Sequence, residues 1–158
     1  MRKLVTIILL AAFSFSCGKD DFVNVKFDYK TFIEQKKLWQ ESITKNYQYD
    51  LFTSGFLLYH GKITVENGDF VKEEIINEHS HTSVSLGYST IDNIYETIEG
   101  IFNRTNGMKK SVFYYTKISV EYDKVNHIPT NIVFSYYAAP KLEVDGNFSF
   151  TITNFTLI

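Results

Sequence analysis

The sequence predicts an α+β fold, in which two helices cover one face of an antiparallel sheet of about five to six strands. Two segments, 28–45 and 91–105, repeat apolar residues at the spacing of an amphipathic helix. The remaining segments are rich in aromatic and β-branched residues, with 14 Phe and 11 Tyr in the chain, and polar turns separate them. Sequential strands joined by short turns pair antiparallel, and two such helices can bury the apolar face of their sheet.

The first helix is expected from about residue 28 to residue 45. Thr31 and Glu34 have the spacing of a capping box, in which the threonine oxygen accepts a backbone N–H and the glutamate reaches back. Behind this start, apolar side chains recur at helical spacing at Phe32, Trp39 and Ile43.

A half-buried strand is expected over 47–51, where apolar and polar residues alternate. A short apolar run, 56–59, follows it. We interpret His60-Gly61 as a turn that leads from this run into the next strand.

Asn67-Gly68 is the best hairpin signal in the chain. Both central residues of a type I′ turn need positive φ, which Asn and Gly tolerate. The flanking segments 62–66 and 69–76 are therefore expected to pair.

The second helix is expected over 91–105, with Ser89 or Thr90 as its N-cap and Gly107 where a terminator belongs. Asp92 near its start suits the helix dipole. Its apolar stripe has the i, i+3, i+4, i+7 pattern and consists of Ile91, Ile94, Tyr95, Ile98, Ile101 and Phe102.

Three strands are expected after this helix, over 112–122, 130–137 and 148–157. Each is rich in β-branched and aromatic residues, and the last alternates cleanly between apolar and polar positions. Segments 123–129 and 139–146 are the connecting turns.

The start of the chain has the parts of a lipoprotein signal peptide, residues 1–16. Arg2 and Lys3 precede an apolar run of thirteen residues, which is too short to span a bilayer as a helix. Cys17, the only cysteine of the chain, follows the run and is expected to carry lipid after cleavage. The small residues before Cys17 also suit the ordinary signal peptidase, which would instead release a soluble protein.

This interpretation divides the chain into a signal peptide, a lipidated cysteine with its tether (17–26) and a single domain (27–158). The residues Gly18-Lys19-Asp20-Asp21 resemble the signal by which some lipoproteins reach the bacterial surface. We therefore expect a location in the bacterial cell envelope, attached to the outer membrane through lipid and exposed at the surface. The alternative is that these charges only keep a short solvated tether off the membrane.

The charge balance excludes one class of partner. Without the signal peptide, 14 basic residues stand against 18 acidic ones, a net charge of about −4. No cluster of Lys and Arg exceeds a pair. Nucleic-acid binding therefore has no electrostatic footprint in this sequence.

The spaced residues of the predicted domain form a familiar series: Trp39, Tyr47-x-Tyr49, Val65-x-Asn67-Gly68, Thr90-Ile91-x-x-Ile94-Tyr95, Val120-x-Tyr122-Asp123, Pro129-Thr130-x-Ile132 and Phe155. This series resembles the family catalogued as domain of unknown function 6174, which consists of small secreted or lipid-anchored bacterial proteins. The resemblance covers roughly residues 39–155. It implies no activity, cofactor or site residue, because none is assigned to the family.

His79 and His81 are the sharpest candidate for a metal site. In an extended strand both side chains point to the same face, where neutral imidazoles can share a zinc or copper ion. Further ligands would have to come from scattered residues such as His60 and His127. The alternative is a pair of solvated histidines on a polar segment, and we expect no cofactor.

No motif in the sequence favours an enzyme. The chain has no Gly-x-Ser-x-Gly motif, which would position a nucleophilic serine, and its one cysteine is expected to carry the lipid. A hydrolase with an unrecognised site is the least favoured hypothesis, because a triad is recognised by geometry rather than composition.

The expected function is therefore that of a non-catalytic binding module. Its partner would be an envelope protein or an extracellular ligand. Aromatic residues at 113–115 and 136–137 put rings on both faces of neighbouring strands, where an exposed face can bind a partner. The alternative for these rings is cross-strand packing. A carrier of a small ligand or of a metal at His79 and His81 is the second hypothesis.

Overall fold

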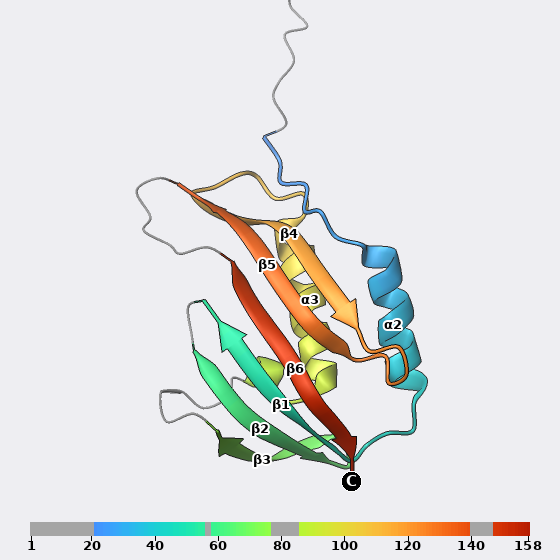
Figure 1. Ribbon diagram of the computed structural model, residues 1–158. Helices are drawn as coiled ribbons and strands as arrows, with labels where there is room; N and C mark the ends of the chain where they lie inside the picture. The colour runs from blue at the N-terminus through green and yellow to red at the C-terminus, as the bar shows by residue number, and fades with distance from the viewer. Residues whose placement is uncertain (1–20, 56–57, 77–85, 140–146) are drawn as a thin grey trace, which may run out of the picture.

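The computed structural model describes residues 21–55, 58–76, 86–139 and 147–158. These residues form a six-stranded antiparallel sheet with two α-helices and one 3₁₀ helix, which confirms the predicted α+β class (Figure 1). In chain order the elements are α2 (Tyr29–Glu41), β1 (Tyr47–Ser54), β2 (Tyr59–Glu66), β3 (Asp69–Ile75), η1 (Leu86–Tyr88), α3 (Ile91–Thr105), β4 (Phe113–Tyr122), β5 (Pro129–Ala138) and β6 (Phe148–Leu157).

The sheet consists of two meanders of three strands each. Its strand order is β3-β2-β1-β6-β5-β4, so the meanders β1–β3 and β4–β6 meet where β6 pairs with β1. The last strand therefore lies in the middle of the sheet. Its position depends on pairs of residues that are distant in sequence, such as Leu51 with Ile152.

One face of the sheet carries the hydrophobic core. Alternate residues of β1 and β2 point into it, and each is at most 1% exposed: Tyr47, Tyr49, Leu51, Ile63 and Val65. Burial of a large apolar side chain contributes about 1.5–3 kcal/mol, so this face contributes much of the stability.

α3 begins and ends where the sequence predicts. The Thr90 side chain accepts a hydrogen bond from the Asn93 N–H at 3.1 Å, and Gly107 follows the helix with φ +79°. Its buried residues reproduce most of the expected stripe, and they are Ile91, Ile94, Tyr95, Ile98, Ile101 and Thr105. In Figure 1 α3 runs behind the strands, while α2 stands beside β4. That both helices cover the same face stays a prediction.

α2 is shorter than predicted and has a different N-cap. Asp28, not Thr31, is the capping residue, and its Oδ1 accepts a hydrogen bond from the Thr31 N–H at 3.1 Å. The expected capping box is therefore wrong. The Thr31 N–H, to which Glu34 would have reached back, is already satisfied by Asp28. The helix ends before Ser42, so Ile43 is 96% exposed instead of packed.

The predicted turn at His60-Gly61 is also wrong, because β2 runs through both residues. The Tyr59 side chain folds over Gly61, and its hydroxyl oxygen lies where a β-carbon at residue 61 would stand. Glycine is here a packing position inside a strand rather than a turn residue. The hairpin at Asn67 and Gly68 is confirmed, with φ values of 54° and 87°.

Residues 21–26, which we expected in the tether, are held against the domain. The Val23 N–H donates to the Met108 carbonyl at 2.8 Å, and the Gly107 N–H donates to the Val23 carbonyl at 2.7 Å. Val23 and Val25 are 3% and 5% exposed and belong to the core. The chain is therefore fixed to the domain almost from its first described residue.

Candidate functional site

The candidate site lies along the outer edge of β4, the last strand on one side of the sheet. Lys26, from the segment that precedes α2, pairs with the centre of this edge. The Lys26 N–H donates to the Thr116 carbonyl, and the Ile118 N–H donates to the Lys26 carbonyl, each at 3.0 Å. The chain then leaves β4 to enter α2. Beyond Ile118, no described residue pairs with the outer edge of the strand.

The register of β4 shows which backbone groups this leaves open. Ile118 lies opposite Phe134 and Val120 lies opposite Ile132, with no register shift between the two pairs. Since the Ile118 N–H points outward to Lys26, the N–H and carbonyl of Val120 point outward as well. The second half of β4 thus presents a donor and an acceptor that no described residue pairs with.

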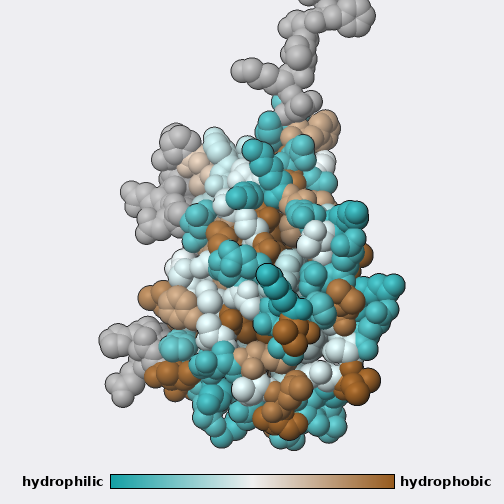
Figure 2. All heavy atoms as spheres, turned by 45° about the vertical axis from the view of Figure 1, so that its right-hand side comes forward, coloured by the Kyte–Doolittle hydropathy of each residue, from teal (hydrophilic) through white to brown (hydrophobic). Residues whose placement is uncertain are grey.

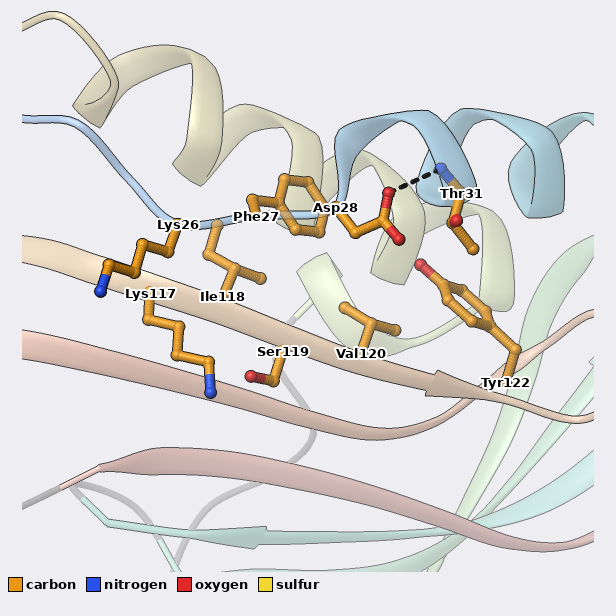
Figure 3. Close-up of a pocket in the computed structure, with 9 residues that line it drawn as sticks. All are labelled: Lys26, Phe27, Asp28, Thr31, Lys117, Ile118, Ser119, Val120 and Tyr122. Atoms are coloured by element: carbon orange, nitrogen blue, oxygen red, sulfur yellow. Dashed lines mark hydrogen bonds between the residues drawn. The ribbon is translucent and has the colours of Figure 1, made fainter.

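A groove of about 420 Å³ runs beside this open edge, which is a volume typical of ligand pockets (Figure 3). We call it the β4 groove. In Figure 3 Lys26 and Lys117 stand at one end, and Thr31 and Tyr122 stand at the other. The complete lining is Lys26, Phe27, Asp28, Thr31, Lys117, Ile118, Ser119, Val120 and Tyr122.

The charges of the β4 groove are unevenly distributed. Lys26 and Lys117 are both exposed. Hydrogen bonds from the backbone and side chain of Thr31 lower the pKa of Asp28, so this carboxylate is ionised and already engaged in capping α2. Burial raises the pKa of Tyr122, and the nearby Asp28 raises it further, so the phenol is neutral at pH 7. The groove therefore has one cationic end.

This arrangement is suited to binding rather than to acid–base chemistry. The residues that line the groove include no histidine or cysteine. The hydroxyl groups of the lining belong to Thr31, Ser119 and Tyr122, and its one carboxylate, that of Asp28, already accepts a hydrogen bond from the Thr31 N–H. Apolar side chains and main-chain groups instead form a surface that a ligand can cover.

The residues singled out from the sequence do not gather in this groove. Cys17, His79 and His81 lie outside the described residues. The His60 ring lies on β2 with its centroid 5.9 Å from that of Phe52, whereas His127 contacts Gln35 of α2 through Nδ1 at 3.0 Å. His60 and His127 thus belong to different parts of the fold, and the described residues contain no group of three metal-ligating side chains.

The aromatic residues of β4 and β5 pair across the strands. The rings of Tyr114 and Tyr137 stack at 5.0 Å, and those of Phe113 and Tyr136 lie 5.0 Å apart. Tyr137 is still 43% exposed. Cross-strand packing is therefore present, and it leaves part of one ring at the surface.

The sequence analysis missed two polar features. It assigned Lys26 to a tether, and so gave no reason to expect a groove beside β4. It also overlooked Asp50, which is 8% exposed and accepts a hydrogen bond from Asn154 Nδ2 at 2.6 Å through Oδ2. The sequence signal for Asp50 and its partner was a break in the alternation of apolar and polar residues in β6. The break falls at Asn154, which has φ +52°.

Comparison with known proteins identifies the family but not an activity. Searches among curated proteins and among solved structures gave no match. The model of a family of unknown function, DUF6174, matches residues 31–157, which is well over half of the chain and includes most residues of the β4 groove. The chain therefore belongs to this family of unknown function, as the spacing of its residues predicted.

Proposed function

We propose that this protein is a lipid-anchored binding module of the bacterial cell envelope, which holds an extended segment of a partner polypeptide in the β4 groove without catalysis. One observation carries the proposal. In the second half of β4, the N–H and carbonyl of Val120 point away from β5, beside a groove with an apolar lining.

The mode of binding would be the addition of a strand to the sheet. An extended segment about 4.8 Å from β4 can pair with the main chain, and its alternate side chains can enter the groove. Lys26 already pairs with β4 in this way, so the partner strand would pair with the same edge beyond Ile118. Lys26 and Lys117 favour an acidic residue at that end of the partner segment.

The lipid anchor is supported by the signal-peptide pattern of residues 1–16 and by the lone Cys17. Among the described residues, no helix has the length and apolar character needed to cross a membrane. Attachment through lipid on Cys17 would hold the protein at the outer membrane, with an envelope protein or extracellular ligand as its partner. No contact of the described residues favours the metal carrier with His79 and His81.

The binding proposal can be tested with peptides. Octapeptides selected from a random phage library on the mature domain would be titrated into isotope-labelled protein and followed by NMR. We expect the amide shifts to centre on Ile118, Val120 and Tyr122. Selected peptides that shift amides elsewhere, with these three unmoved, would contradict the proposal.

Two variants sharpen this test. Val120→Pro removes the outward N–H without removing a hydrogen bond to β5, and it should abolish peptide binding while the domain stays folded. Lys117→Glu should weaken the binding of acidic peptides through its side-chain charge, while the main-chain groups of β4 stay unchanged. Ile43→Ala, at an exposed residue that does not line the β4 groove, is the matched control and should bind normally.

The anchor needs its own experiment. Cys17→Ala should move the protein from the membrane fraction to the soluble fraction, and mass spectrometry of the unsubstituted protein should show fatty acyl groups on residue 17. Retention of the variant in the membrane fraction would argue against lipid attachment.

A further inference from the structure

We propose that the end of the domain formed by Phe22, Lys109, Lys110 and Val112 rests on the anionic headgroups of the membrane that holds Cys17. We call these four residues the anchor-side end. The inference depends on the lipid anchor proposed above. Beyond that anchor, the inference names a surface of the folded domain that contacts lipid headgroups, and it fixes how the domain is oriented on the membrane.

The length of the tether is the first argument. Asp21 is fixed to the domain, because its carbonyl accepts a hydrogen bond from the Lys110 N–H at 2.7 Å, and Phe22 bridges to Lys109. Only four peptide units separate Cys17 from Asp21, which can span about 14 Å at full extension. A lipidated Cys17 lies at the interface, so these residues can reach the headgroup layer, which is several ångströms thick.

The side chains at the anchor-side end are the second argument. Phe22 is 61% exposed and Val112 is 65% exposed, although both are apolar. Lys109 and Lys110 are also exposed and add two basic side chains beside these apolar ones. Aromatic and aliphatic side chains next to basic ones suit an anionic membrane surface.

Exposed apolar side chains alone do not decide which end of the domain faces the membrane, as the opposite end of the domain shows. Ile43, Leu157 and Ile158 are 96%, 60% and 56% exposed, so that end exposes more apolar side chains. In Figure 2 apolar residues also gather at the lower end, away from the N-terminal trace. However, β6 runs ten residues from Phe148 to Leu157, about 30 Å, so this end is beyond the reach of the tether.

This orientation also places the β4 groove. Lys26 lies four residues after Phe22, so the cationic end of the groove is nearest the membrane, and Tyr122 lies farther from it. The partner segment would then enter the groove with its acidic end toward the bilayer.

The test uses the lipidated chain, purified from membranes and reconstituted in vesicles that contain lipids with a spin-label quencher. Because Cys17 is occupied by lipid and is the only cysteine, Val112→Cys supplies a single thiol for a bimane fluorophore. Ile43→Cys supplies the matched control at the far end. Vesicles of phosphatidylglycerol are compared with vesicles of phosphatidylcholine.

We expect strong quenching of bimane at residue 112 in phosphatidylglycerol, weaker quenching in phosphatidylcholine and none at residue 43. Lys109→Glu combined with Lys110→Glu should weaken contact with the anionic surface, by about fivefold for each lysine lost. Absence of quenching at residue 112, or equal quenching at residue 43, would overturn the inference. If mass spectrometry shows no lipid, the anchor proposal fails as well, whereas a lipidated protein without quenching refutes the anchor-side end alone.

Discussion

Tyr47→Phe tests how the sheet holds the start of α3. The Ile91 N–H, one of the four unsatisfied donors at the start of a helix, donates to the Tyr47 hydroxyl oxygen at 3.1 Å, and these residues are 0% and 1% exposed. Phenylalanine keeps the ring, so its contacts with the rings of Trp39 and Phe155 remain. The buried N–H loses its acceptor, which costs about 1–3 kcal/mol.

Urea unfolding measures this loss directly. With a slope of about 2 kcal/mol per molar urea, a cost of 2 kcal/mol lowers the midpoint by about 1 M. Tyr29→Phe is the matched control, because the Tyr29 hydroxyl donates at 2.9 Å to Glu99, which also binds Lys36 and can reach water. It should cost about 1 kcal/mol or less. Equal midpoints for the two variants would refute this account of how α3 begins.

Three further predictions concern titration and packing. Burial raises the pKa values of Tyr47 and Tyr88 to about 12, above the unfolded value of about 10, so stability should be complete below pH 10 and fall as the pH rises through 12; a difference in phenolate absorbance between the unsubstituted protein and Tyr88→Phe that develops at pH 10, before unfolding, would contradict this. Hydrogen bonds, first from a lysine and then from a tyrosine, lower the pKa of Glu99, so Glu99→Gln should cost about 1 kcal/mol at pH 7, and thermal unfolding should show this difference shrink as the pH falls below about 4; a difference independent of pH would count against it. Gly61→Ala should displace the Tyr59 ring and cost about 1–3 kcal/mol in urea unfolding, and an unchanged midpoint would show that the ring can move freely.

The elements that the sequence predicts best are those whose local signals agree. α3 has an N-cap threonine, a continuous apolar stripe and a terminal glycine, and all three signals mark the same bounds. The hairpin at Asn67 and Gly68 is specified by two residues that tolerate positive φ. β6 was predictable because its apolar and polar residues alternate through most of its length.

Where the prediction fails, a tertiary contact decides the structure. Gly61 looks like a turn residue until the Tyr59 ring is placed over it. Thr31 looks like a helix cap until Asp28 is seen to bind its N–H. The central place of β6 follows from long-range pairing with β1, which no local pattern encodes.

The candidate site was hidden for the same reason. Lys26 and Lys117 are far apart in sequence, and only the pairing of the N-terminal segment with β4 brings them to one end of a groove. The open edge depends on where that pairing stops, which is a property of the chain path into α2. Sequence reasoning could identify β4 as a strand but could not identify it as an edge strand with an open half.

Amide hydrogen exchange at Val120 tests the central claim most directly. In the free mature domain, the Ile118 N–H is bonded to Lys26 and should be protected, whereas the Val120 N–H, two residues along the same strand, should exchange more than tenfold faster. A selected peptide should then protect Val120 without changing Ile118. Equal protection of the two amides in the free domain would show that the edge of β4 is already closed, and would contradict the proposed binding site.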